Sequence, residues 1–86
     1  MKPNYISDND WQLVNSICNL NPEEPYLIAG IGWHETHWGT IGAGVNGYHL
    51  GFGFYPGSPM LAKVKGLENQ LKYAHEFIVA SFKFPL

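Results

Sequence analysis

Residues 25–40 read PYLIAGIGWHETHWGT, and this stretch decides the fold that the sequence predicts. Pro25 suits the first position of a helix, and the pattern predicts a helix over residues 25–38. Gly30 and Gly32 each cost such a helix about 1 kcal/mol relative to alanine, a cost usually accepted where another backbone packs closely. We therefore expect this helix to lie at the centre of the fold.

Glu35 is the candidate catalytic residue of this helix. At about 100° per residue it falls in the middle of an arc formed by apolar and aromatic positions. The residues that share this arc are Leu27, Ile28, Ile31, His34 and Trp38. We therefore expect a buried carboxylate that its apolar neighbours keep protonated, as a general acid requires. The alternative is a structural glutamate that backbone donors or a lysine satisfy.

A second helix is predicted before this one. Ser7 can cap it and Asp10 follows three residues later, close to a capping box, so it should start at Ser7 or Asp8 and end near Leu20. Its apolar stripe is formed by Trp11, Val14 and Cys18, with Leu13, Ile17 and Leu20 beside them. Cys18 on this stripe is interpreted as a buried, inert thiol.

Residues 39–59 are dense in glycine and aromatic side chains, which indicates loop and short extended structure or a short hairpin. Ser58 and Pro59 then resemble the cap and first position of a long third helix, which Gly66 could split. Its apolar face is formed by Met60, Val64, Leu67, Leu71, Ala74, Ile78 and Phe82. The expected fold class is mainly α, with a small α+β arrangement as the alternative, in one domain over residues 1–86.

Composition excludes several classes of protein. The 86-residue chain has a net charge of −2 and no arginine, which argues against a nucleic-acid partner. Its single cysteine cannot form an internal disulfide, and no segment approaches the roughly 20 apolar residues of a membrane span. Residues 1–4 are not followed by an apolar run of signal-peptide length. If the protein acts outside the cytoplasm, either another component releases it or the chain is a mature or excised piece of a longer protein.

Two stretches resemble a known family. Residues 29–40, AGIGWHETHWGT, resemble the helix-end motif E-S/T-x-W/F-G of lysozyme-like enzymes that cleave peptidoglycan, especially bacterial and phage glucosaminidases and lytic transglycosylases. Residues 46–53, NGYHLGFG, are similar to the N-x-x-x-x-G-hydrophobic stretch that follows in the glucosaminidase group. The resemblance covers about residues 26–55 and implies a lysozyme-like fold in which Glu35 is the catalytic acid.

The chain departs from this family in two ways. It is shorter than most members, so part of the usual substrate lobe is missing or comes from a second subunit. It is also slightly acidic, whereas positive charge often speeds the encounter of an enzyme with an anionic cell wall.

The distribution of carboxylates favours a mechanism with a single acid. A two-carboxylate glycosidase needs a second Asp or Glu about 5–9 Å from the first. No such residue lies between Thr36 and Leu67, and Glu68 and Glu76 are interpreted as solvated helix charges. Glu35 would protonate the glycosidic oxygen, while the substrate's own 2-acetamido group or 6-hydroxyl closes on the sugar carbon. The first route ends in hydrolysis and the second in an anhydro sugar, and the sequence leaves both open.

Tyr48 is the first candidate to stabilise the developing positive charge, and its alternative role is a loop aromatic packed on the third helix. The proposed substrate-binding residues are Trp38, Thr40, His49, Phe52, Tyr55 and Tyr73. The rings of Phe52, Phe54, Tyr55 and Trp38 could offer flat faces to sugars or could equally form the core.

No metal or organic cofactor is expected. His34 and His37 are three residues apart, whereas the zinc-protease motif needs two histidines four apart on one helical face. Residues 42–47 match G-x-G-x-x-G by letter, but no apolar strand precedes them, as a dinucleotide site requires.

The sequence thus predicts a glycosidase that acts on peptidoglycan strands of N-acetylglucosamine and N-acetylmuramic acid, at the cell wall in the periplasm or outside the cell. Two alternatives from other classes remain open. One is a catalytically silent domain of the same fold that binds glycan or forms part of a phage or secretion assembly. The other is a plain helical interaction module in which Glu35 belongs to a buried ion pair.

Overall fold

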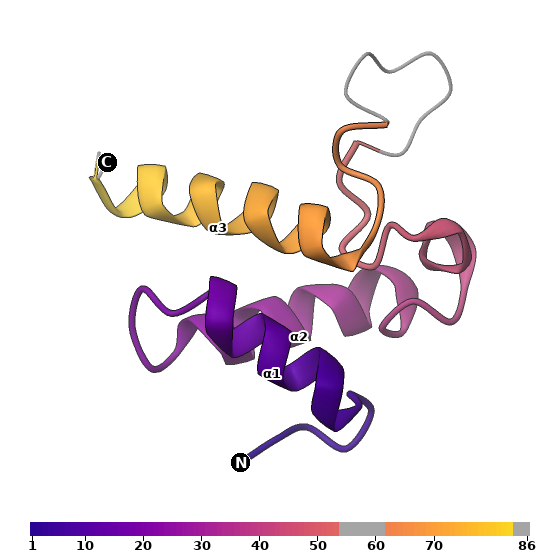
Figure 1. The fold of residues 1–86 in the computed structure, drawn as a ribbon, viewed down its shortest axis with the longest axis horizontal. Helices are drawn as coiled ribbons and strands as arrows, with labels where there is room; N and C mark the ends of the chain where they lie inside the picture. Colours follow the sequence, from indigo (N-terminus) through magenta and orange to yellow (C-terminus); the bar gives the residue numbers. More distant parts are fainter. Residues whose placement is uncertain (54–61, 84–86) are drawn as a thin grey trace.

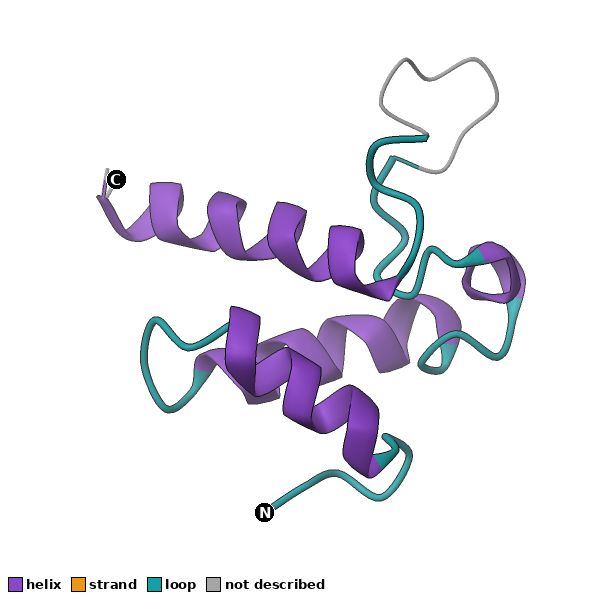
Figure 2. Cartoon of the chain, in the orientation of Figure 1, coloured by secondary structure: helices purple, strands orange, loops and turns teal. Residues whose placement is uncertain are grey.

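The computed structural model describes residues 1–53 and 62–83, and these ranges contain helices and loops but no strand (Figure 2). The elements are α1 (Asp8–Ile17), α2 (Glu24–Thr36), the short 3-10 helix η1 (Gly42–Asn46) and α3 (Leu67–Lys83). The expected mainly helical class is confirmed. The extended structure predicted after α2 is not found over residues 39–53, because the chain turns repeatedly there, with φ of 95° at Gly47 and 77° at Gly51.

The start of α1 follows the predicted cap. The Ser7 hydroxyl accepts the Asp10 N–H at 3.1 Å. The helix ends at Ile17, three residues before the predicted Leu20, because Cys18 leaves helical geometry with φ −105° and ψ 75°. This bend turns the Cys18 side chain into the core, where none of it is exposed.

Capping also fixes the start of α2. The Asn21 side-chain oxygen accepts the N–H groups of Glu23 and Glu24, each at 3.0 Å, and so satisfies donors that a helix N-terminus leaves unpaired. At the other end α2 stops at Thr36, because His37 adopts a left-handed conformation with φ 46°.

The buried face of α2 is not the predicted one. The residues that it buries are Glu24, Pro25, Ile28, Ala29, Gly32 and Thr36. Leu27, in contrast, is 50 % exposed, and Glu35 is exposed. The predicted burial of Glu35 is therefore wrong. Apolar side chains occur all round this helix, and Gly32 packs inward because it has no side chain: a Cβ there would lie 2.4 Å from the Trp38 ring.

α3 starts later than predicted. Ser58 and Pro59, the expected start, lie outside the described residues, and the chain over residues 62–66 forms turns. Gly66 has φ 92°, outside the helical region, and α3 begins at the next residue.

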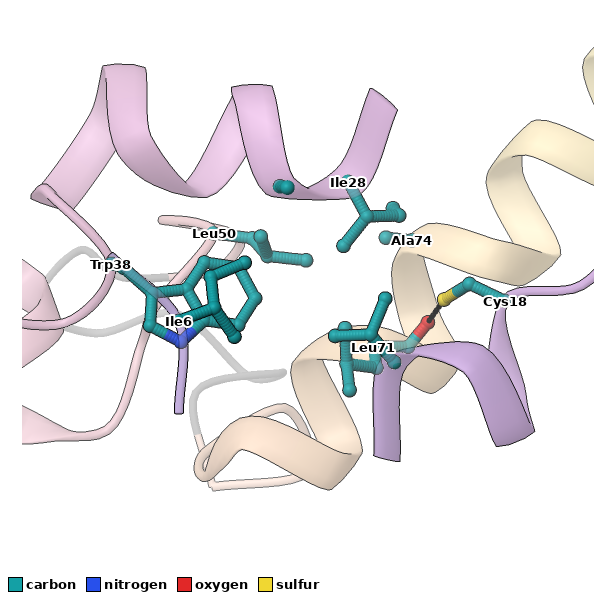
Figure 3. Close-up of a cluster of buried hydrophobic side chains, with 9 residues drawn as sticks. Ile6, Cys18, Ile28, Trp38, Leu50, Leu71 and Ala74 are labelled. Atoms are coloured by element: carbon teal, nitrogen blue, oxygen red, sulfur yellow. Dashed lines mark hydrogen bonds between the residues drawn. The ribbon is translucent and has the colours of Figure 1, made fainter. Parts of the chain in front are cut away.

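The core lies between the three helices. α3 packs on α1, α1 packs on α2, and η1 packs against α2, as Figure 1 shows. The buried cluster drawn in Figure 3 consists of Ile6, Val14, Cys18, Ile28, Ala29, Trp38, Leu50, Leu71 and Ala74. Trp38 and Leu50 come from the chain that follows α2, so the region after the helix is anchored in the same core as the helices.

The Gln70 side chain joins this region to α3. It is fully buried, and its oxygen accepts the N–H groups of Leu50 at 3.2 Å and Phe52 at 3.1 Å. Its nitrogen donates to the carbonyl oxygens of Phe52 at 2.8 Å and Val64 at 2.7 Å. All four hydrogen-bonding positions of the amide are thus used, and residues 50–52 are held against α3.

We expect Gln70→Leu to lower the free energy of unfolding by about 3 kcal/mol, because it leaves buried backbone donors and acceptors without partners. Urea unfolding measures this loss. Asn69→Leu is the matched control, since Asn69 is exposed and its side chain only donates to the Lys65 carbonyl, and it should change stability by less than about 1 kcal/mol. Equal losses in the two variants would contradict the bridging role of Gln70.

Candidate active site

Glu35 is the next-to-last residue of α2, and its side chain lies along the backbone of Gly51. A Cβ added at Gly51 would lie 3.6 Å from the Glu35 Oε2 atom and 3.7 Å from its Cβ. Gly51 is held in place because its N–H donates to the Tyr48 carbonyl at 2.9 Å and because Gln70 binds the residues on either side of it. The carboxylate thus lies between the end of a helix and a fixed turn, and it is open to solvent.

Two neighbouring hollows share Leu27 and Ile31, and Glu35 lines one of them. It lines an open depression of about 360 Å³ together with Tyr26, Leu27, Gly30, Ile31 and His34. A groove of about 320 Å³ between α2 and α3 is lined by Leu27, Ile31, Phe52, Ala74, Phe77, Ile78 and Ser81. Because the two hollows share Leu27 and Ile31, a largely apolar surface runs from Glu35 to α3.

Within residues 1–53 and 62–83, Glu35 is the one carboxylate that lines either of these two hollows. Glu68 forms an exposed ion pair with Lys72 at 3.0 Å, and Glu76 is exposed on α3, so the prediction that both are surface charges is confirmed. The described geometry therefore offers one acid at this place and no carboxylate facing it.

The turn after Glu35 is strained. His37 and Trp38 have φ of 46° and 54°, in the left-handed region that costs a non-glycine residue roughly 1–2 kcal/mol. The contacts of Trp38 offset this cost: its side chain is 5 % exposed, and its Nε1–H donates to Asp10 Oδ2 at 3.0 Å. The sequence left Trp38 either as a flat face for sugars or as a core residue, and the structure shows that it belongs to the core.

Thr36, the residue after Glu35, ties the end of α2 to the loop. Its hydroxyl is buried, donates to the His49 carbonyl and accepts the Gly39 N–H at 2.8 Å. η1 approaches from the other side, since a Cβ on Gly44 would lie 2.7 Å from the Thr36 Cβ. The S/T position of the motif therefore has a structural role here.

We expect Thr36→Val to lower the free energy of unfolding by about 2 kcal/mol, because the isosteric side chain leaves the Gly39 N–H and the His49 carbonyl without this partner. Thr40→Val is the control: Thr40 is exposed and its hydroxyl donates to the His37 carbonyl at 2.9 Å, so its loss should stay within about 0.5 kcal/mol. Thermal unfolding of both variants measures the difference, and a Thr36→Val protein as stable as Thr40→Val would refute the assignment.

His49 packs on the same turn. Its ring lies in T-shaped contact with Trp38, with centroids 5.7 Å apart, and a Cβ on Gly39 would lie 2.5 Å from it. Its Nδ1 atom is buried without a hydrogen-bond partner among the described residues. Burial lowers the pKa of His49, and the charge of Asp10 opposes this shift in part.

This lowered pKa predicts a pH dependence of stability. As pH falls below about 6.5, unfolded His49 takes up a proton before the folded residue does, so the protein loses stability. His49→Gln should reduce the stability lost between about pH 7.5 and pH 5, whereas His34→Gln, at an exposed histidine, should not. Urea midpoints at the two pH values test this, and an unchanged pH dependence in His49→Gln would contradict it.

The other predicted site residues lie in different places. Phe52 lines the groove, and its ring is 5.4 Å from that of Tyr73. Tyr48 is 4 % exposed and does not line the depression that holds Glu35. Thr40 is exposed and is likewise not part of that depression. Phe54 and Tyr55 lie outside the described residues, and none of the described candidates other than Glu35 lines the depression that holds Glu35.

Two features escaped the sequence analysis. Gln70 interrupts the apolar face made by Leu67, Leu71 and Ala74, and a polar residue on such a face was the available signal for a buried bridge. The second feature is a group of possible metal ligands. The ligand atoms of Cys18, Glu24 and His75 lie within 4.8 Å of one another, although His75 is 51 residues from Glu24 in the sequence.

No protein-family model, curated protein or solved structure matches this chain. None of the helices in the described part of the chain combines the length and hydropathy needed to cross a bilayer.

Proposed function

We propose that this chain is a lysozyme-like glycosidase that cleaves the amino-sugar backbone of peptidoglycan, with Glu35 as its acid and then its base. The observation that carries the proposal is the position of Glu35. It stands in the motif at the end of α2, lies against the Gly51 turn, and is the one described carboxylate that lines the depression there. The lysozyme-like character of the helical fold is part of this proposal.

The exposure of Glu35 sets a condition on the mechanism. In the free protein the Glu35 side chain is exposed and water reaches the carboxylate. A sugar that fills the depression, which Leu27 and Ile31 also line, would displace this water from the carboxyl group. Desolvation favours the neutral, proton-donating form of a carboxyl group. Substrate binding itself would thus prepare the acid.

Bond cleavage would then proceed with one carboxyl group. Glu35 gives its proton to the glycosidic oxygen, and the bond between this oxygen and the anomeric carbon breaks. The carbonyl oxygen of the 2-acetamido group, or the 6-hydroxyl oxygen, forms the new bond to the anomeric carbon. The Glu35 carboxylate next removes a proton from a water molecule that opens the acetamido intermediate, or from the attacking 6-hydroxyl.

The groove beside Glu35 supplies contacts for more distant parts of a glycan. Phe52 at its wall and Phe77, which is 64 % exposed, present aromatic surface. Sugar rings have an apolar face that packs on such side chains. Binding along the groove would hold the scissile bond beside the carboxylate and reduce the entropy lost at the reacting centre.

A second candidate is a catalytically silent domain of the same kind, which binds glycan or another chain through this surface. The observation that favours it is the exposure of Glu35 in the free protein, together with the burial of Tyr48. In that case the protein would bind peptidoglycan and release nothing.

The decisive experiment is mass spectrometry of soluble products after purified peptidoglycan is incubated with the wild-type protein, Glu35→Gln and Glu76→Gln. We expect Glu35→Gln to lower release at least about 100-fold, because the amide keeps the shape of the side chain but transfers no proton. Glu76→Gln, at an exposed glutamate of α3, should match the wild type. Both variants should unfold at the wild-type temperature.

The other possible outcomes of this experiment distinguish between the alternatives. Release by Glu35→Gln at the wild-type rate would refute Glu35 as the acid. Binding of the wild type to peptidoglycan without any released product would establish the silent domain. A reducing end on the products would show hydrolysis, and an anhydro ring would show attack by the 6-hydroxyl.

A further inference from the structure

We propose that Cys18, Glu24 and His75 form a binding site for a divalent metal ion of the zinc type. Cys18 follows α1, Glu24 begins α2 and His75 lies in α3, so the site would join the three helices. Their ligand atoms all lie within 4.8 Å of one another. The proposal is independent of the function proposed for Glu35, which lies at the opposite end of α2, about 16 Å away at 1.5 Å per residue.

The three side chains offer the donor atoms that zinc prefers. Zinc binds thiolate sulfur, imidazole nitrogen and carboxylate oxygen in tetrahedral geometry, with bonds of about 2.0–2.3 Å. Such bonds place neighbouring ligand atoms roughly 3.5 Å apart. The His75 Nδ1 and Glu24 Oε2 atoms are already 2.7 Å apart, so small rotations of the side chains would open the space for an ion.

Burial and hydrogen bonds hold the ligand side chains in place before an ion binds. None of Cys18 is exposed, and the Glu24 side chain is 1 % exposed. The Leu20 N–H donates to the Glu24 Oε1 atom at 2.6 Å and orients the carboxylate, as partners outside the ligand shell do in metal sites. The His75 side chain is 28 % exposed, which leaves a path for the ion and room for a water molecule as fourth ligand.

Charge also favours a divalent cation. A Cys18 thiolate and the Glu24 carboxylate carry two negative charges, which a divalent ion neutralises in a buried place. Burial, assisted by the charge of Glu24, raises the pKa of Cys18 to about 12, so the free thiol is protonated at neutral pH. Because zinc binds the thiolate form, metal binding replaces the S–H bond by a metal–sulfur bond and releases that proton to solvent.

The test uses Co²⁺ and Zn²⁺ with the whole chain. Because the chain has a single cysteine, a thiolate-to-cobalt charge-transfer band in the near ultraviolet can come only from Cys18. We expect this band in the wild type, its loss in Cys18→Ser, and a large reduction in His75→Gln. The matched control is the double variant His34→Gln/His37→Gln, which removes the two motif histidines and should keep the band.

Thermal unfolding gives a second measurement that does not depend on a variant. Zinc at about 100 times its Kd should raise the wild-type Tm by about 10 °C, because the three ligands come together only in the folded chain. A wild type with no band and no Tm change would overturn the proposal. A band that is equally strong in His75→Gln, or in the urea-unfolded chain, would also overturn it, because it would show adventitious binding to the thiol.

Discussion

The buried amide of Gln70 is the interaction on which the rest of this structure depends. Its four hydrogen bonds hold the backbone of residues 50–52 and of Val64 against α3. A buried amide is unfavourable unless all its donors and acceptors are paired, so it selects one arrangement of the chain around it. Leu50 in the core and Gly51 beside Glu35 both follow from that arrangement.

The end of α2 adds the second constraint. The left-handed residues His37 and Trp38 turn the chain back, and the buried indole of Trp38 is bound to Asp10 in α1. Strained backbone of this kind persists only where surrounding contacts determine it, and it occurs often beside functional sites. Together with the buried Thr36 hydroxyl, this turn fixes the position of Glu35 while leaving its carboxylate open to solvent.

The two ends of α2 therefore have opposite environments. At the N-terminal end Glu24 is buried beside His75 and near the Cys18 thiol, where a divalent ion would neutralise the charge. At the C-terminal end Glu35 faces an open depression that continues into an apolar groove. One helix thus carries a buried carboxylate that contacts His75 at one end and an exposed carboxylate that lines an open depression at the other.

The sequence by itself determined the mainly helical class, the Ser7 cap, the burial of Cys18 and the surface position of Glu68. These features could be predicted because helix capping, hydrophobic periodicity and i,i+4 pairing each depend on residues that are close together in the sequence. The burial of Glu35 was predicted wrongly, since α2 has apolar residues on all sides and its inward face includes glycine. Only the tertiary structure decided which face is buried, where Gln70 points, and that Cys18, Glu24 and His75 meet. Those outcomes depend on contacts between residues far apart in the chain, which no local pattern encodes.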